Sequence, residues 1–217
     1  MRNYSDKGVK MCKTITGLAS IKKSDIELVV WLRSLPPQFQ DWIDQTDANN
    51  LPELRILVKP NKLQLALEPL LDKCGLKICN MRQQLIIDIA DLVTQFACIT
   101  QSNEVDVRLE RIDRDACWKF HRDTVETRLI TTYRGPTTEW VQQAYAEQAI
   151  KEQREFNGPL ERLDDGDVAI FKGRCSSPNK GIVHRSPPII GRGLTRLLLC
   201  LNQKTATSPN PWSKDLV

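Results

Sequence analysis

Two short polar segments hold the only histidines of the 217-residue chain, Phe120-His121-Arg122-Asp123 and Val183-His184-Arg185-Ser186. Each lies beside an apolar run that is typical of a β-strand. Strand side chains alternate between two faces, so His121 and Asp123 share a face. If a second strand brings His184 to the same place, two imidazoles and one carboxylate form a facial triad. That ligand set is typical of non-heme Fe(II) oxygenases and leaves coordination positions open for substrate and dioxygen.

An oxygenase that uses Fe(II) and 2-oxoglutarate also needs a cation for the distal carboxylate of this co-substrate. Arginine suits the role because its guanidinium binds a carboxylate through two parallel hydrogen bonds. Arg196, twelve positions after His184 and on the next predicted strand, is the first candidate. Arg192, in a loop between two glycines, and Arg128 are the further candidates for cofactor binding. Tyr133 is the candidate catalytic residue if its hydroxyl faces the metal pocket, and a packing residue if it does not.

Cysteine offers a competing metal site. Cys117 precedes His121 by four positions, and Cys175 precedes His184 by nine. Two thiolates and two imidazoles would form a closed tetrahedral zinc site. Neither cysteine has the two-residue spacing of zinc ribbons, and free cysteine is commonly buried as a small apolar residue. The alternative function is therefore a non-catalytic zinc-binding or metal-homeostasis protein, and the third is a structural or interaction domain whose histidines only pack.

The composition is ordinary for a globular protein, with 41% hydrophobic and 27% charged residues. The N-terminal residues lack the apolar stretch of a signal peptide, and no run approaches a membrane span. Seven scattered cysteines argue against a secreted disulfide framework, so we expect a cytoplasmic protein with no membrane partner. Residues 174–217 carry seven Lys or Arg and one acid, but the basic residues are spaced apart, which does not favour nucleic acid as a partner.

Hydrophobic periodicity changes near residue 102. Before this point, apolar residues recur at helical spacing in the segments 38–46, 63–71 and 81–98, while residues 26–31 are typical of a buried strand or a helix start. After it, apolar and charged residues alternate over 105–110, as in a half-buried strand. Turn residues separate the further strands expected at 128–133, 167–171, 181–184 and 196–201, and one helix is expected at 138–155. Short strands with this punctuation indicate a β-sandwich or jelly roll.

These elements predict an α+β fold in which an N-terminal helical part packs on a C-terminal double-stranded β-helix, a cupin-like jelly roll. The expected divisions are a flexible N-terminus, a mainly helical part, a metal-binding double-stranded β-helix and a loose tail, at residues 1–24, 25–102, 103–204 and 205–217. In this frame the metal lies inside the barrel mouth, sheltered from bulk water. Loops and the helical part would build the substrate pocket. The sequence therefore does not identify the substrate, which is either a small molecule or a protein.

Longer blocks of the sequence resemble a bacterial family labelled domain of unknown function 1826. The resemblance covers residues from about 25 to 202 and rests on VWLRSLP at 30–36, DIADLV at 88–93, CWKFHRD at 117–123, RLITTYRGPTTEW at 128–140, GIVHRSPP at 181–188 and RLLLC at 196–200. The chain departs from the family at Thr137-Thr138, where Gly-Thr is expected after Gly-Pro, and the turn there would be less tight.

A wider resemblance is to the Fe(II)/2-oxoglutarate oxygenase superfamily. It rests on His121, Asp123, His184 and the following Arg196, a sparse pattern that cupin-like metal proteins without oxygenase activity share. The resemblance implies Fe(II) and 2-oxoglutarate as cofactors, with zinc as the alternative metal.

Overall fold

The computed structural model describes residues 8–176 and 181–214. Within this part of the chain the strands form two sheets, one of seven strands in the order β1-β2-β8-β5-β10-β4-β3 and one of three strands in the order β7-β6-β9. The large sheet is antiparallel except at its edge, where β1 runs parallel to β2. The protein thus has a mixed α and β fold dominated by one large antiparallel sheet.

Each of the five strands predicted after residue 102 is present. The large sheet contains β1 (Val9–Cys12), β2 (Leu28–Trp31), β3 (Leu54–Val58), β4 (Val105–Ile112), β5 (Thr127–Arg134), β8 (Val168–Lys172) and β10 (Arg196–Gln203). The small sheet contains β6 (Glu139–Val141), β7 (Glu161–Arg162) and β9 (Val183–Arg185). An isolated antiparallel bridge between His121 and His184 continues the small sheet beyond β9.

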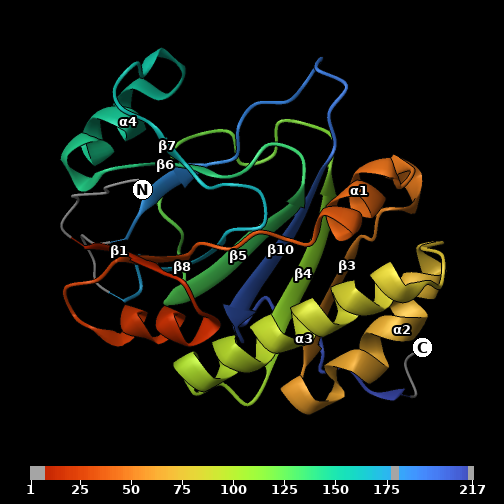
Figure 1. Ribbon diagram of the computed structural model, residues 1–217. Helices are drawn as coiled ribbons and strands as arrows, with labels where there is room; N and C mark the ends of the chain where they lie inside the picture. The colour runs from red at the N-terminus through yellow and green to blue at the C-terminus, as the bar shows by residue number, and fades with distance from the viewer. Residues whose placement is uncertain (1–7, 177–180, 215–217) are drawn as a thin grey trace.

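Three α-helices cover one face of the large sheet (Figure 1). They are α1 (Pro37–Gln45), α2 (Leu63–Lys73) and α3 (Asn80–Thr100), and they confirm the three helices predicted from apolar spacing. The smaller α4 (Ala146–Glu152) lies beside the small sheet, and the short 3₁₀ helices are η1 (Ile15–Lys22), η2 (Ala48–Asn50), η3 (Pro60–Lys62), η4 (Gln143–Tyr145) and η5 (Gln153–Glu155). Pro37 occupies the first turn of α1, where a missing backbone N–H costs nothing.

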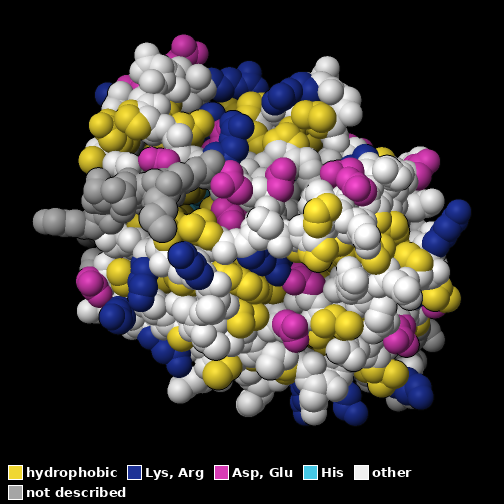
Figure 2. All heavy atoms as spheres, in the orientation of Figure 1, with side chains coloured by type: hydrophobic (Ala, Val, Ile, Leu, Met, Phe, Trp, Pro, Cys, Tyr) yellow, Lys and Arg dark blue, Asp and Glu magenta, His cyan; other side chains and the backbone are white. Residues whose placement is uncertain are grey.

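The large sheet is buried on both faces because its strands alternate between two apolar layers. On β10, Leu197, Leu199 and Leu201 pack toward the helices, whereas Leu198 and Cys200 pack toward the small sheet. The inner face of the large sheet, toward the small sheet, is therefore separate from its outer face, which the helices cover. On the outside of the helical layer, apolar, basic and acidic side chains are interspersed (Figure 2).

The helix expected at 138–155 is wrong at its start, because residues 139–141 form β6 instead. Glu139 is buried there and accepts hydrogen bonds from Arg162 at 2.6 Å and from Arg185 at 2.8 Å. The charge of Glu139 is therefore neutralised by the neighbouring strands of the small sheet. A composition rich in Gln, Glu and Ala does not reveal such cross-strand pairing.

Parts of the expected flexible ends are ordered. Between residues 8 and 24, β1 pairs with β2, and Leu18 of η1 is fully buried. In the tail, the backbone N–H of Trp212 donates to the Leu57 carbonyl at 2.7 Å, and the Trp212 side chain packs on the core. Residues 1–7 and 215–217 lie outside the described part of the chain. The segment 25–102 supplies β2 and β3 to the large sheet in addition to its helices.

No helix in the described ranges is both long enough and apolar enough to cross a membrane.

A polar cluster ties α3 to the outer face of the large sheet. The Asp88 carboxylate accepts hydrogen bonds from the Tyr133 hydroxyl at 2.6 Å and from both terminal nitrogens of Arg33. Arg33 also donates its Nε–H to the Gly166 carbonyl at 2.6 Å. Burial raises the pKa of Tyr133 well above its usual range, so the phenol remains a hydrogen-bond donor.

Removing this acceptor is expected to destabilise the fold. The substitution Asp88→Ala leaves the buried Tyr133 hydroxyl and the Arg33 guanidinium without their shared partner, and should lower the free energy of unfolding by about 2–4 kcal/mol in urea denaturation. Asp91→Ala, at an exposed position of the same helix, should change it by less than about 0.5 kcal/mol. Equal losses in the two variants would contradict this role of Asp88.

Candidate metal centre

The structure brings together the three residues that the sequence singled out as metal ligands. Nε2 of His121 lies 3.4 Å from Oδ1 of Asp123, and Nε2 of His184 lies 3.5 Å from Oδ2 of the same carboxylate. The ligand atoms all lie within 4.8 Å of one another. Asp123 and His184 are buried, and His121 is partly exposed. The backbone bridge between the two histidines accounts for this convergence, because it places the segment at His121 beside β9.

Both imidazoles are held by their other ring nitrogen. Nδ1 of His121 lies 2.7 Å from the Lys119 carbonyl oxygen, and Nδ1 of His184 lies 3.2 Å from that of Ile182. A carbonyl oxygen only accepts, so each Nδ1 carries the proton and donates it. In a neutral ring Nε2 then has a free lone pair, and in both rings it faces Asp123. This arrangement is typical of metal-ligating histidines.

The electrostatics of the centre favour a cation. Burial lowers the pKa of His184 to about 4, so this ring is neutral at pH 7. Burial opposes ionisation of Asp123, but the hydrogen bond with His121 and the electrostatic interactions with His184 and Arg128 lower its pKa to about 2. The hydrogen bond with Asp123 raises the pKa of His121. A carboxylate and two imidazole lone pairs converge here, and only a proton or a metal ion relieves their mutual repulsion.

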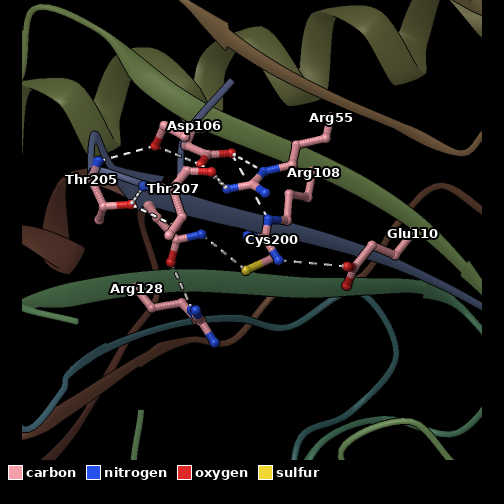
Figure 3. A network of polar contacts seen from close by, with 10 residues as sticks. Arg55, Asp106, Arg108, Glu110, Arg128, Cys200, Thr205 and Thr207 are labelled. Atoms are coloured by element: carbon pink, nitrogen blue, oxygen red, sulfur yellow. Dashed lines mark hydrogen bonds and ion pairs between the residues drawn. The ribbon is translucent and has the colours of Figure 1, made fainter. Parts of the chain in front are cut away.

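Arg128 orients the carboxylate of the centre. Its Nη1 donates to Oδ2 of Asp123 at 2.6 Å, and its Nε donates to Oδ1 of Asn202 at 2.8 Å. Asn202 lies directly across from Arg128 in the pairing of β10 with β5. Figure 3 shows Arg128 within the polar network of the inner sheet face. The contacts of Arg128 thus support Asp123, whereas the sequence made it a candidate for cofactor binding.

A cavity of about 180 Å³ lies beside the two histidines. Its wall includes residues of the inner face of β4, β5 and β10 together with residues near β9, among them Arg108, Ile112, Cys117, His121, Arg128, Ile130, His184, Ser186, Leu198 and Cys200. Two imidazoles and several apolar side chains therefore line one cavity. The arrangement can hold a metal ion with a small organic molecule next to it.

Arg196 reaches the wall of this cavity through Ser186. The arginine is fully buried on β10, where its Nε donates to the Pro136 carbonyl at 2.6 Å and its Nη1 donates to Oγ of Ser186 at 2.6 Å. Its Nη2 is buried and has no hydrogen-bond partner. Burial lowers the pKa of Arg196 to about 10, so the group is still cationic at neutral pH. The sequence did not identify Ser186 as its partner, although Ser186 shares a strand face with His184.

Two candidate residues are not brought to the centre. Tyr133 lies on the outer face of the large sheet, where its hydroxyl donates to Asp88, so the expectation that it faces the metal pocket is wrong. Its offset of five from Arg128 is odd, and odd offsets on a strand point to opposite faces. Arg192 lies in an exposed loop, contacts the Pro188 carbonyl at 3.4 Å and lines a different pocket with Glu139.

The closed zinc site is not formed either. In the described part of the chain, the one group able to hold a metal contains His121, Asp123 and His184 but neither Cys117 nor Cys175. Cys117 lines the cavity, and its carbonyl accepts from the Ser186 backbone N–H at 2.9 Å. It is thus a wall residue of the cavity.

A family model described as "Protein of unknown function (DUF1826)" matches residues 12–202. A search of the curated proteins found no match. Similar solved structures include dioxygenase for auxin oxidation 1 from Arabidopsis thaliana in its 2-oxoglutarate complex, at 8% identity and a TM-score of 0.49, with 97% of each chain covered. A prolyl-4-hydroxylase from Pseudomonas putida is similar at 9% identity and a TM-score of 0.45, with 88% of this chain and 100% of that chain covered.

Loss of either imidazole is expected to abolish stoichiometric metal binding. A three-ligand site retains too few donors after His121→Ala or His184→Ala, and elemental analysis of protein loaded anaerobically with Fe(II) should find less than a tenth of the wild-type metal. Circular dichroism should show that both variants stay folded. Full metal content in both variants would exclude these histidines as ligands.

Cys117→Ser is expected to retain the metal. The thiol is outside the ligand group, so its replacement should leave the metal-to-protein ratio and the metal affinity unchanged within about twofold. Competition with a chromophoric chelator measures the affinity. A hundredfold or greater loss of metal affinity in Cys117→Ser would instead support the four-ligand zinc site.

Proposed function

This chain belongs to the DUF1826 family, and we propose that it is an Fe(II)- and 2-oxoglutarate-dependent oxygenase. The observation that carries the proposal is a triad of lone-pair donors, His121, Asp123 and His184, whose two histidines line a cavity that a buried arginine approaches through Ser186. Two neutral imidazoles and one carboxylate are the ligand set of non-heme Fe(II) oxygenases. The pairing of Arg128 with Asp123 supports it, because ligating carboxylates are themselves held by hydrogen bonds.

Arg196 would hold the distal carboxylate of 2-oxoglutarate. Its Nη2 is a buried donor without a partner, and such a group is costly unless a ligand satisfies it. Ser186 accepts from Nη1 of Arg196, so its own hydroxyl proton is free to donate to the same carboxylate. A buried cation and a hydroxyl thus form a site for one anionic group beside the cavity. When bound, Fe(II) with 2-oxoglutarate supplies the activation of dioxygen for hydroxylation.

The chain's own residues would orient and shelter these groups. The carbonyls of Lys119 and Ile182 keep both Nε2 lone pairs turned to the metal position, and Arg128 fixes the direction of the Asp123 carboxylate. The apolar wall formed by Ile112, Ile130 and Leu198 would limit water beside the reacting atoms. A low local dielectric strengthens each of the charged contacts.

We further propose that residues 103–204 form a double-stranded β-helix. Along the chain, β4, the His121 bridge, β5, β6 with β7, β8, β9 and β10 alternate between the large and the small sheet. This alternation is what a chain wound between two facing sheets would give. Residues 25–102 would then add edge strands and the helical layer, and the open end of the roll would hold the metal.

The first test is formation of the ternary complex. Protein loaded with Fe(II) without oxygen should develop a visible charge-transfer band on titration with 2-oxoglutarate, and should convert 2-oxoglutarate to succinate when air is admitted. Protein that binds Zn(II) in preference to Fe(II), with no affinity for 2-oxoglutarate, would favour the non-catalytic metal-homeostasis protein instead.

The second test concerns the arginine. Arg196→Ala should weaken 2-oxoglutarate binding by about thirtyfold or more in calorimetry while the metal stays bound, because losing one partner of a buried ion pair costs about 2–5 kcal/mol. Arg192→Ala, in the exposed loop, is the matched control and should bind as the wild type does. Retained metal in Arg196→Ala shows that the fold survives. Equal affinities in Arg196→Ala and wild type would remove Arg196 from the site.

A further inference from the structure

Arg108 lines the same cavity with an incompletely paired guanidinium, and we propose that it binds an anionic group of the primary substrate. The inference rests on the proposed function, because it takes this cavity as the active site. It assigns a chemical class to the substrate: a small organic molecule with a hydrocarbon part and one carboxylate or phosphate group.

Strand register separates Arg108 from the proposed 2-oxoglutarate site. Arg108 on β4 lies opposite Cys200 on β10, whereas Arg196 on β10 lies opposite Ile112 on β4. The two arginines are therefore four residues apart along the paired strands, or about 13 Å between their backbone positions. On the other side of β10, Cys200 lies opposite Ile130 of β5. An anion at Arg108 would thus be distinct from the co-substrate carboxylate at Arg196.

The nearest acidic groups do not satisfy Arg108. Asp106 is already bound by Arg55, whose Nε and Nη2 donate to it at 3.1 and 2.7 Å, and by the Ser208 hydroxyl at 2.8 Å. Nε of Arg108 lies 3.9 Å from Oδ1 of Asp106, and its Nη1 lies 4.0 Å from Oε1 of Glu110. Both distances exceed hydrogen-bond length. Figure 3 shows Arg108 between these two carboxylates.

The Nε–H group of Arg108 is buried without a hydrogen-bond partner, although the side chain as a whole is 30% exposed. A buried donor of this kind favours a ligand that accepts a hydrogen bond, and a negative charge strengthens that bond. Arg108 lines the cavity, so a carboxylate or phosphate bound there would lie beside its guanidinium.

The other arginines of the cavity wall are less suited to this role. Arg111 donates to the carbonyls of Ala48 and Asn49, and Arg128 holds Asp123. Arg114 is 75% exposed, so water screens its charge. Glu53 and Glu110 also line the cavity, and its apolar wall residues include Ile130 and Leu198, which would contact the hydrocarbon part of the substrate. The cavity of about 180 Å³ limits that part to a small molecule.

Calorimetric titration of the full-length protein with benzoate, phenylphosphate and neutral benzyl alcohol tests this inference. At least one of the two anions should bind saturably and more tightly than benzyl alcohol, and the tighter one identifies the favoured anionic group. Arg108→Gln should weaken that anion by tenfold or more, because a hydrogen bond to a charged group is lost. Arg114→Gln is the control and should bind the anion as the wild type does.

A second variant guards against misfolding. Arg108→Lys keeps the charge but loses the planar fork, and should bind the anion with an affinity between those of wild type and Arg108→Gln. Unchanged anion affinity in Arg108→Gln, or no saturable anion binding by wild type, would overturn the inference. Titration of wild type with 2-oxoglutarate in parallel reports on the oxygenase separately: anion binding that requires Arg108 without any 2-oxoglutarate binding would leave the anion site standing and remove the oxygenase.

Discussion

The positions of two protons govern the chemistry of this protein. Nδ1 of His121 and Nδ1 of His184 both donate to main-chain carbonyls, each two residues earlier in the chain. The backbone thereby turns both Nε2 lone pairs toward Asp123, whose carboxylate has no proton to offer them. Three groups that repel one another in this state are held together by the strands that carry them. A proton or a metal ion between them would relieve this repulsion.

The large sheet separates the candidate metal centre from the core under the helices. On the outer face, Asp88 accepts hydrogen bonds from Arg33 and Tyr133, which joins α3 to the strands. On the inner face, Arg128 donates hydrogen bonds to both Asn202 and Asp123. Because alternate residues of one strand serve the two faces, β5 contributes both to helix packing and to the candidate metal centre. A change of register by one residue would exchange these roles.

The convergence of His121, Asp123 and His184 was predicted from the sequence. His121 and Asp123 are two positions apart and their side chains meet, although only His121 takes part in a β-bridge and Asp123 lies outside the strands. The partner histidine was identifiable because the chain holds only two. The assignment of Tyr133 to the metal pocket was wrong because strand side chains alternate between two faces. An offset of five from Arg128 places Tyr133 on the opposite face. The short strand at Glu139 was missed because its burial depends on two arginines that are distant in the sequence.

Other features depend on strand order, which one sequence does not reveal. Ser186 meets Arg196, and Asn202 meets Arg128, only because of how β9, β10 and β5 are placed. Only the structure places Arg108 on the cavity wall, because its sequence context is an ordinary alternating strand. Local patterns thus predicted which three side chains converge, whereas the groups that orient them and line the cavity required the structure.

We propose that His121, Asp123 and His184 bind one catalytic metal beside an anion pocket at Arg196. The decisive measurement is anomalous diffraction from crystals grown anaerobically with Fe(II) and 2-oxoglutarate. We expect a single iron peak bonded to both Nε2 atoms and to the Asp123 carboxylate, with 2-oxoglutarate extending from the iron to Arg196. An iron peak elsewhere, or none at this triad with 2-oxoglutarate absent from Arg196, would contradict it.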